Sequence, residues 1–394
     1  MFIVRFFNYI YLQNIENKEM NIGFEAKRVF RNFTGLGNYS RAVVKALSEN
    51  YPDNRYFLYT PDNKGSLNTS LNLKAPNISI VTAPVKALKA IWRVLQINKN
   101  LKEDKIDLFH GLSNELPLNI RKSKVPAVVT IHDLIFIRYP QYFKLIDRNI
   151  YKYKFRKACI NANRIIAISE QTKRDIIHFF KIDPHKIDIV YQGCDPVFSI
   201  PTVREDLQII KHKYSLPDSF LLCVGTIEQR KNQLLILQAL NQIPEDIKLV
   251  LVGKPTAYKT ELTTYIQTYN LENRVHFLEK VPFQDLPLIY QLANIFVYPS
   301  RFEGFGIPLL EAISAGVPAI GATGSCLEEA GGPDSLYTYP DNHNELAKYI
   351  NMVLQSDELR QKMIEKGLQY ASKFSEENIA RNLMNVYKKT LENA

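Results

Sequence analysis

The 394-residue sequence has few cysteines and no long hydrophobic run. Its four cysteines stand apart, with no C-x-x-C pair and no Cys/His cluster at metal-ligand spacing, which argues against a disulfide framework and a structural metal site. No stretch approaches the roughly 18 apolar residues of a membrane-spanning helix. The G-x-S-x-G, H-E-x-x-H and P-loop motifs are also missing. The sequence therefore does not match the motif patterns of hydrolases or NTPases. The sparse, isolated cysteines favour a reduced, cytoplasmic protein.

The first residues of the sequence do not have the pattern of a first strand or helix of a folded domain. Met1–Tyr11 is apolar and aromatic with one arginine, as in a weak signal sequence, but no small-residue cleavage site follows. The polar stretch Gln13–Glu19 comes next, and Met20 opens a better first strand at Asn21–Ala26. We therefore interpret the leading residues as a ragged extension and leave the true start open between Met1 and Met20.

Composition and charge indicate a globular chain of two or three domains. Hydrophobic residues make up 46% and charged residues 23% of it, which are ordinary values for a folded protein. Residues 1–200 hold 31 Lys and Arg against 17 Asp and Glu (+14), whereas the remainder holds 19 against 23 (−4), in agreement with the total of +10. A basic half and a mildly acidic half suggest two domains with different partners. The basic half suits an anionic membrane, a phosphorylated substrate or nucleic acid.

Apolar strands alternate with helices through both halves. In the second half we expect strands at 220–227, 247–253, 274–281, 294–300 and 317–322 and helices at 233–243, 256–270, 284–293 and 308–315. In the first half we expect strands at 21–26, 55–59, 106–109, 127–131, 164–168 and 187–191 and a helix at 38–50. This rhythm predicts an α/β fold of two Rossmann-like, doubly wound domains facing a cleft. The predicted boundaries are 20–200 and 218–374 for the domains, 202–217 for a linker and 375–394 for a last helix.

The strongest chemical signal is Arg301–Glu311, RFEGFGIPLLE, which directly follows a predicted strand. A carboxylate accepts two hydrogen bonds at once, which matches the vicinal diol of a ribose or hexose, so Glu303 and Glu311 are candidate sugar ligands. The Gly304–Gly306 loop can bring backbone N–H groups close to a ligand, and the helix start favours an anion. The alternative is a turn and a helix whose early glutamate only suits the helix dipole, but the whole string after a strand disfavours it.

Two adjacent cations, Arg230 and Lys231, lie in Glu228–Asn232 after another predicted strand. Arginine can grip two phosphate oxygens and lysine acts as a compact charge, so the pair is placed to hold a diphosphate. A solvated basic loop is the alternative. The position at the carboxyl edge of the sheet, in the same domain as Glu303, favours the diphosphate site.

The segment Thr34–Ser40, TGLGNYS, stands between the first strand and an amphipathic helix. Gly35 and Gly37 offer a flexible loop and a helix N-terminus for an anion. The third glycine of a dinucleotide fingerprint is missing, since position 40 is Ser40, so nicotinamide binding is disfavoured. A plain tight turn stays equally open.

His132, in Thr130–Leu134, ends a strand of the basic half. It is a candidate for contacts with sugar or acceptor hydroxyls, with Asp133 nearby to orient a group. A purely structural histidine is the alternative. His110, also at a strand end, is a lesser candidate.

Two basic segments carry aromatic residues. Lys144–Lys157 interleaves Tyr and Phe with Lys and Arg, and Val85–Leu101 places lysines and Arg93 around Trp92. Such helices can lie on an anionic membrane surface, and they fit solvated helix faces equally well. Nucleic-acid binding is a third option, but no recognised module is present.

Together these strings resemble the retaining glycosyltransferases with a GT-B fold, in the large family numbered four. The resemblance spans Met20 to the C-terminal helix; FEGFGIPLLEA with EQRKN upstream is highly specific, and GLGNYS, HGLSN and TIHDL resemble mannosyltransferase-like members acting on bacterial polysaccharides. The family often has Asp-Ala-Arg at the end of the first strand, where this chain has Glu25-Ala-Lys27. Both changes keep the charge.

The resemblance implies a role for each motif. Arg230 and Lys231 would neutralise the leaving diphosphate, Glu311 would hold the ribose, and Glu303 would contact the transferred hexose. Backbone N–H groups would assist at Phe305, Gly306 and Ile307. The Gly35–Gly37 loop would close over the phosphates, His132 would face the sugar and the acceptor, and the final helix would cross back to the N-terminal domain.

The resulting expectation is a metal-independent, retaining hexosyltransferase without a cofactor. The donor would be a GDP- or UDP-sugar, with GDP-mannose favoured, and the acceptor a lipid-linked glycan or polysaccharide in surface polysaccharide (lipopolysaccharide) synthesis. We expect a cytoplasmic protein, peripheral on the inner face of the cytoplasmic membrane, and no nucleic-acid partner. The alternatives are a non-catalytic sugar-nucleotide or glycan binding protein of the same fold, and a nucleic-acid binder driven by the basic half.

Overall fold

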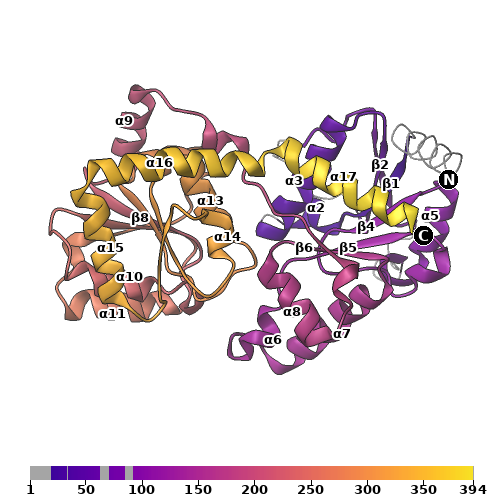
Figure 1. Cartoon of the computed structure of the whole chain (residues 1–394), viewed down its shortest axis with the longest axis horizontal. Coiled ribbons are helices and arrows are strands. Elements are labelled where there is room, and N and C mark those ends of the chain that lie inside the picture. The colour runs from indigo at the N-terminus through magenta and orange to yellow at the C-terminus, as the bar shows by residue number, and fades with distance from the viewer. Residues whose placement is uncertain (1–18, 33, 63–70, 85–91, 394) are drawn as a thin grey trace, which may run out of the picture. The chain divides into compact units, whose positions relative to one another are not determined.

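In a computed structural model the chain forms two compact units (Figure 1). The structure describes residues 19–32, 34–62, 71–84 and 92–393, so the stretch Met1–Tyr11 lies outside the described residues. Unit 1 contains the described residues up to Tyr191 together with those from Glu376 onward, and unit 2 is Gln192–Ser375. Within the described ranges, no helix has the length and apolar character needed to cross a bilayer.

Unit 1 is built on a seven-stranded sheet with the order β3-β2-β1-β4-β5-β6-β7, in which every pair is parallel. The strands are β1 (Asn21–Glu25), β2 (Arg55–Thr60), β3 (Ile78–Thr82), β4 (Leu108–Gly111), β5 (Ala127–Ile131), β6 (Arg164–Ala167) and β7 (Ile187–Ile189). The helices are α2 (Lys27–Arg31), α3 (Gly35–Asn50), α5 (Ile97–Glu103), α6 (Ile135–Arg138), α7 (Leu145–Asn161), α8 (Glu170–Phe180) and α17 (Glu376–Glu392). The predicted parallel sheet is confirmed, and β3 is a strand that the sequence analysis missed.

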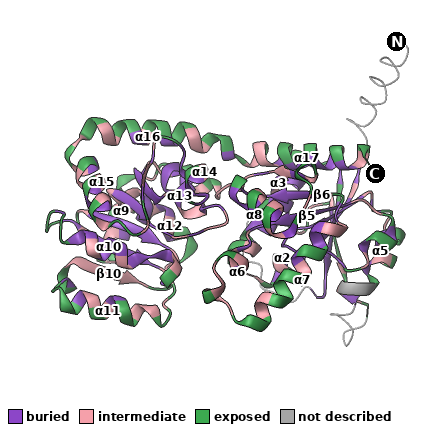
Figure 2. Ribbon diagram, turned by 60° about the horizontal axis from the view of Figure 1, so that its bottom comes forward, coloured by how far each residue is buried: buried purple, intermediate pink, exposed green. Residues whose placement is uncertain are grey.

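The strands of unit 1 are apolar because helices cover both faces of the sheet (Figure 2). Successive side chains of a strand point to opposite faces, and β5 follows this rule. Val128 lies in a core with residues of α3 and α17, whereas Val129 and Ile131 lie in a second core with residues of α7 and α8. The continuous apolar run of β5 therefore serves two cores at once.

Helix α17 completes the first of these cores although it is the last helix of the sequence. Leu383, Met384 and Tyr387 are buried in it, and α17 packs along α3. Near its start, Lys45 Nζ donates to Glu376 Oε1 at 2.8 Å. The predicted return of the last helix to the N-terminal domain agrees with this packing.

Unit 2 is a six-stranded parallel sheet with the order β10-β9-β8-β11-β12-β13. The strands are β8 (Phe220–Val224), β9 (Lys248–Val252), β10 (Val275–Leu278), β11 (Ile295–Tyr298), β12 (Ala319–Ala322) and β13 (Leu336–Thr338). The helices are α9 (Arg204–Lys213), α10 (Gln233–Leu240), α11 (Tyr258–Thr268), α12 (Leu286–Leu292), α13 (Ile307–Ser314), α14 (Leu327–Gly331), α15 (His343–Gln355) and α16 (Asp357–Ala371). All five predicted strands of this half are present; the sequence analysis assigned no element to residues 323–374.

The segment 202–217, predicted to be a linker, instead holds helix α9 inside unit 2. Ile210 is buried, and α9 packs against α12. Asp285 fixes its end by accepting hydrogen bonds from Lys213 Nζ at 2.6 Å and from the Tyr214 hydroxyl at 2.5 Å. Polar composition concealed this helix because most of its surface is exposed, and the compact unit begins earlier, at Gln192.

Candidate functional site

The main candidate site lies where the strand order of unit 2 reverses. The chain runs outward from β8 to β10 and then returns to place β11 on the other side of β8. At such a switch point the loops after the two neighbouring strands diverge and leave a crevice at the strand carboxyl ends, which is where doubly wound sheets bind ligands. Arg230 and Lys231 lie in the loop after β8, and Glu303 lies in the loop after β11.

The structure brings these three residues into direct contact. Lys231 Nζ lies 2.6 Å and Arg230 Nη1 lies 2.8 Å from Glu303 Oε1. The Ser300 hydroxyl donates to the same oxygen at 2.5 Å and the Tyr298 hydroxyl at 3.1 Å. All of these contacts fall on Oε1, and no side chain among the described residues is found to donate to Oε2 of Glu303, an oxygen that can accept further hydrogen bonds.

The charges in this cluster stabilise one another. Burial alone would raise the pKa of the Glu303 carboxyl, but Lys231 and Arg230 outweigh it and hold that pKa at about 2. Burial would likewise lower the pKa of Arg230, yet Glu303 and Glu228 raise it above its usual value. The site therefore presents a permanent carboxylate and a permanent guanidinium, preorganised before any ligand arrives.

Main-chain and amide contacts hold the two loops together. Asn232, in the left-handed conformation with φ of 59°, donates through Nδ2 to the carbonyl oxygens of Pro299 at 3.2 Å and Pro340 at 2.7 Å. The Arg301 amide donates to the Arg230 carbonyl at 2.9 Å. These bonds fix the spacing between the loop that carries Arg230 and Lys231 and the loop that carries Glu303.

The glycine-rich loop then turns into helix α13. Gly306 caps the helix with φ of 116°, a conformation that an L side chain rarely adopts, and a Cβ there would lie 2.7 Å from Leu327. Phe305 is buried, and Ile307 is the first helical residue. Pro308 has no N–H, and the Leu309 and Leu310 amides donate to the Gly306 carbonyl, so at the helix start the Ile307 amide and the positive helix end are what this turn presents to an anion.

Glu311, on α13, has different surroundings. Its Oε2 accepts a hydrogen bond from the Tyr290 hydroxyl at 2.9 Å, and no cation is recorded beside it among the described residues. Burial raises the pKa of Glu311 to about 7; the Tyr290 bond lowers it and the charge of Asp195 adds to the rise. Unlike Glu303, this carboxyl changes its charge near neutral pH.

In unit 1, Gly35 and Gly37 lie in the first turn of α3, which begins three residues earlier than predicted. The Gly37 amide donates to the Thr34 carbonyl at 2.9 Å and to Asn32 Oδ1 at 3.3 Å. A Cβ at Gly37 would lie 1.7 Å from the Asn32 carbonyl oxygen, whereas one at Gly35 would meet nothing within 4 Å. Gly37 is therefore required by a close backbone approach, and Gly35 is not.

His132 is buried at the end of β5, where its ring bonds to a main-chain carbonyl and packs against an aromatic side chain. Its Nε2 donates to the Leu112 carbonyl at 2.9 Å, which fixes the tautomer because a carbonyl only accepts. Burial lowers the pKa of His132 to about 4, so the ring is neutral at pH 7. The Tyr39 ring meets it edge-on with centroids 4.6 Å apart.

Tyr39 connects this histidine to the core. The Tyr39 hydroxyl lies 3.0 Å from Thr130 Oγ1, which lies 2.8 Å from His110 Nε2. His110 Nδ1 in turn lies 2.6 Å from the Tyr387 hydroxyl of α17. Burial lowers the pKa of His110 to about 3, so this ring is also neutral and serves the core rather than a ligand.

Sequence reasoning missed several members of these groups: Tyr298, Ser300, Asn232, Tyr290 and Tyr39. Tyr298 and Ser300 had a weak signal, since they end the strand that runs into Glu303. Tyr290 had none, because its role depends on a packing contact between α12 and α13 rather than on a motif.

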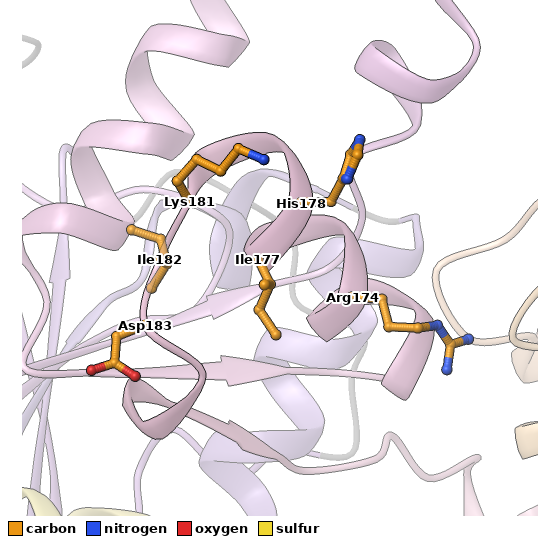
Figure 3. A pocket seen from close by; sticks show the side chains of 6 residues that line it. All are labelled: Arg174, Ile177, His178, Lys181, Ile182 and Asp183. Atoms are coloured by element: carbon orange, nitrogen blue, oxygen red, sulfur yellow. The ribbon is translucent and has the colours of Figure 1, made fainter.

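Other features of the described chain do not form a second site of this kind. No group of three His, Cys, Asp or Glu side chains that could hold a metal ion is found among the described residues. A shallow hollow of about 610 Å³ on α8 is lined by Arg174, Ile177, His178, Lys181, Ile182 and Asp183 (Figure 3). None of these residues was singled out in the sequence.

Family comparisons match both units. Residues 33–198 match Glycosyltransferase Family 4, and residues 204–370 match Glycosyl transferases group 1. Curated relatives include the O-antigen chain mannosyltransferase B of Escherichia coli, which is 29% identical over 94% of this chain and 100% of its own length. The serotype-specific mannosyltransferase WbdA of E. coli is 27% identical over 73% of this chain, and the match spans only 37% of WbdA.

Solved structures share the fold. Anabaena HepE in complex with UDP has a TM-score of 0.75 and 19% identity, with 94% of this chain and 100% of that chain covered. WaaG, a glycosyltransferase involved in lipopolysaccharide biosynthesis, has a TM-score of 0.65 and 18% identity, with 93% and 99% covered. At such identities these structures support the two-domain GT-B architecture alone.

Proposed function

We propose that this chain, which belongs to the GT-B glycosyltransferases of family four, transfers mannose from GDP-mannose with retention of configuration. The acceptor is a lipid-linked glycan or a polysaccharide of the cell surface. The mannose assignment rests on the relatives named as O-antigen mannosyltransferases, and the guanine base on the resemblance of the N-terminal motifs to mannosyltransferase-like proteins.

The observation that carries the proposal is the cluster of Glu303, Arg230 and Lys231 at the switch point of unit 2. A nucleotide sugar has a diphosphate at one end and hydroxyls at the other, and this cluster offers two cations beside one carboxylate oxygen. No other described group combines them with the amides of a helix start.

The cations act on the leaving group. When the bond between the anomeric carbon and the diphosphate oxygen breaks, the electron pair stays on that oxygen and the nucleoside diphosphate gains negative charge. Arg230 and Lys231, with the Ile307 amide at the start of α13, would stabilise this charge as it develops, which is the most effective place for preorganised donors. On this proposal side chains and the helix end serve in place of a metal ion.

The carboxylates act on the sugar and the ribose. Glu303 Oε2 would accept hydrogen bonds from hexose hydroxyls, which orients the anomeric carbon and favours its oxocarbenium-like transition state. Glu311 would accept from the two ribose hydroxyls. The acceptor oxygen would bond to the anomeric carbon on the face that the diphosphate leaves, and its proton would pass to a diphosphate oxygen, so that atoms and charge balance.

His132 would contribute a neutral hydrogen-bonding ring on the side of unit 1. Its Nε2 proton is bound to the Leu112 carbonyl, and the family resemblance directs the ring toward the sugar and the acceptor. We place the reaction in the cytoplasm beside the inner membrane face, because nucleotide sugars are water-soluble and the proposed acceptor is bound to lipid.

A panel of nucleotide sugars tests the proposal. Thermal unfolding is measured with GDP-mannose, GDP-glucose, UDP-glucose and UDP-galactose, since a ligand at 100 times its dissociation constant adds about 2.7 kcal/mol of stability. GDP-mannose is expected to give the largest rise, and incubation with an acceptor extract should release GDP and an α-mannoside. A larger rise with a UDP-sugar would overturn the donor assignment.

The variant Lys231→Met tests whether the rise depends on the proposed site, because it keeps the length of the side chain and removes its charge. The rise with GDP-mannose should disappear in this variant. A non-catalytic binding protein of the same fold would show the rise in the native chain but would release no GDP in the presence of any acceptor.

A further inference from the structure

Helix α7 has two apolar faces, and only one of them is covered. Phe155, Ala158 and Cys159 face the core of unit 1. On the other side Ile146 and Tyr153 are 73% and 56% exposed. A surface helix normally buries its single apolar stripe and turns polar residues to water, so a second apolar face calls for a partner.

The exposed apolar residues form a continuous surface. Ile146, Ile150 and Tyr153 are spaced by four and three residues, which places them on one side of the helix. Leu118, in the loop after β4, is exposed as well. Between the helix and this loop lies a cavity of about 390 Å³ with a mainly apolar lining of Glu115, Leu116, Leu118, Asn149, Ile150, Tyr153 and Lys154. We call this surface the α7 apolar face.

Cations flank the α7 apolar face. From Lys144 to Lys157 the sequence has six Lys and Arg and one acidic residue, Asp147. The exposed cations are Lys144, Lys152, Arg156 and Lys157. This composition favours a lipid surface over a protein partner. Protein–protein interfaces are depleted in lysine, whereas lysine, arginine and tyrosine around an apolar stripe are typical of helices at an anionic lipid surface.

The second basic segment of the sequence does not share these properties. Trp92 is buried, and its indole Nε1 donates to Asn100 Oδ1 at 2.9 Å; residues 85–91 lie outside the described residues. The hollow on α8 (Figure 3) is basic too, but its isoleucines, Ile177 and Ile182, are half-buried. Exposed apolar side chains and cations therefore coincide at α7.

We propose that the α7 apolar face docks this protein onto a bilayer that contains anionic lipid. Ile146, Ile150 and Tyr153 enter the boundary between headgroups and acyl chains, and the flanking lysines contact the lipid phosphates. The cavity beneath Ile150 and Tyr153 accommodates hydrocarbon from the bilayer. This inference names the membrane contact that the proposed function requires, but it does not depend on the identity of the donor or acceptor.

Flotation of the full chain with vesicles tests the proposal. Vesicles of equal parts phosphatidylcholine and phosphatidylglycerol should bind the native protein, and pure phosphatidylcholine should bind it at least tenfold more weakly. The variant Ile146→Ser/Ile150→Ser/Tyr153→Ser should lose at least tenfold in binding to the anionic vesicles. Since these side chains are largely exposed, thermal unfolding should show that the variant remains folded.

Charge variants separate specific docking from general attraction. Lys152→Gln/Arg156→Gln should weaken binding and its dependence on salt, whereas Arg174→Gln/Lys181→Gln on α8, which removes the same charge, should bind like the native protein. Equal loss in both pairs, or unchanged binding of the triple serine variant, would overturn the proposal. So would a stable dimer of the native protein that the serine variant converts to monomer, because a second copy would then cover the face.

The outcome stays separate from that of the proposed function. Failure of every nucleotide sugar to bind would overturn the donor assignment and leave the flotation result standing. Normal GDP-mannose binding with no flotation would overturn the docking surface alone.

Discussion

Lys231 Nζ and Glu303 Oε1 lie 2.6 Å apart, although 72 residues separate them in the sequence. The contact exists because β8 and β11 are neighbours in the sheet and their loops end at the same edge. A motif after one strand and a motif after another therefore become one charged cluster. Removing Glu303 takes away the carboxylate partner of buried Lys231, whereas removing Lys231 leaves Glu303 paired with Arg230.

Opposite effects on diphosphate binding are expected from the two partners. Lys231→Met should weaken GDP binding at least 100-fold, because it removes the cation proposed to contact the diphosphate, and truncating one partner of such a charge pair costs about 2–5 kcal/mol of binding free energy. Glu303→Gln should leave GDP affinity equal or higher, since two cations lose their carboxylate, while mannosyl transfer falls at least 100-fold. Calorimetric titration with GDP and a transfer assay measure both. If both variants lost GDP affinity to the same extent, the proposed placement of Lys231 on the diphosphate and Glu303 on the sugar would be wrong.

A surface pair provides the control for that comparison. Lys259 Nζ lies 2.8 Å from Glu279 Oε1, with both side chains partly exposed. Exposed ion pairs contribute at most about 1 kcal/mol, so Lys259→Met should change neither GDP affinity nor transfer and should shift the free energy of unfolding only slightly.

The pH dependence of stability should reveal Glu311. Its pKa is about 7 in the folded chain against a usual 4.5, so between these values the folded protein holds a proton that the unfolded chain has lost. Stability should therefore fall as the pH rises from 4.5 to 7, by about 3 kcal/mol, and level off above. Urea unfolding at several pH values measures this fall. Glu311→Gln, which cannot titrate, should remove it.

The same carboxyl should make donor affinity depend on pH. If ionised Glu311 accepts two ribose hydroxyls, affinity for GDP-mannose should rise up to tenfold per pH unit below 7 and become constant above it. In Glu311→Gln the affinity should be lower and flat over the range. An equally steep rise in that variant would show that a different group titrates.

Two neighbouring glycines should respond in opposite ways to the same substitution. Gly37→Ala places a Cβ 1.7 Å from the Asn32 carbonyl oxygen, so the start of α3 must shift, and we expect a loss of at least 2 kcal/mol in unfolding free energy. Gly35→Ala meets nothing within 4 Å and should raise stability by about 0.4–1 kcal/mol. Chemical denaturation of both variants measures the difference. Equal changes in unfolding free energy for the two variants would contradict the close approach of Gly37 to the Asn32 carbonyl oxygen.

The buried contact between Tyr387 and His110 should be important for unit 1. Tyr387→Phe removes the hydroxyl 2.6 Å from His110 Nδ1 and leaves a buried nitrogen unpaired, which should lower stability by about 1–3 kcal/mol. Tyr269→Phe, at a half-exposed tyrosine of unit 2, is the matched control and should be nearly neutral. Combining Tyr387→Phe with His110→Leu should cost less than the sum of the single changes.

The parallel strands could be predicted because both of their faces are buried, which leaves a continuous apolar run such as Phe220–Val224. The strand β3 was missed because several of its residues are exposed, and β13 because it has only three residues. Predicted strands also ran too far at their carboxyl ends: 294–300 includes Pro299 and Ser300, which are buried but belong to the loop after β11. Burial continues there because these residues support the site.

Motif reading identified the charged residues of the site but not their arrangement. Arg230, Lys231 and Glu303 were visible as strings after strands, yet the convergence of four donors on one oxygen of Glu303 depends on strand pairing. The contrast between Glu303 and Glu311 was hidden for the same reason. Both are buried glutamates of one motif. Burial raises the pKa of Glu311 in spite of the Tyr290 hydrogen bond, whereas at Glu303 the two neighbouring cations outweigh burial and lower the pKa.

The position of α17 has a consequence for synthesis of the protein. Leu383, Met384 and Tyr387 belong to a core whose members outside α17 come from the first 190 residues of the sequence. A ribosome that has produced all the strands of unit 1 has therefore not yet supplied the helix that seals it, whereas unit 2 is fully translated before that helix emerges. Although domains usually fold in the order of their translation, here all of unit 2 is synthesised before unit 1 receives the helix that completes its core, and one apolar face of unit 1 stays uncovered until then.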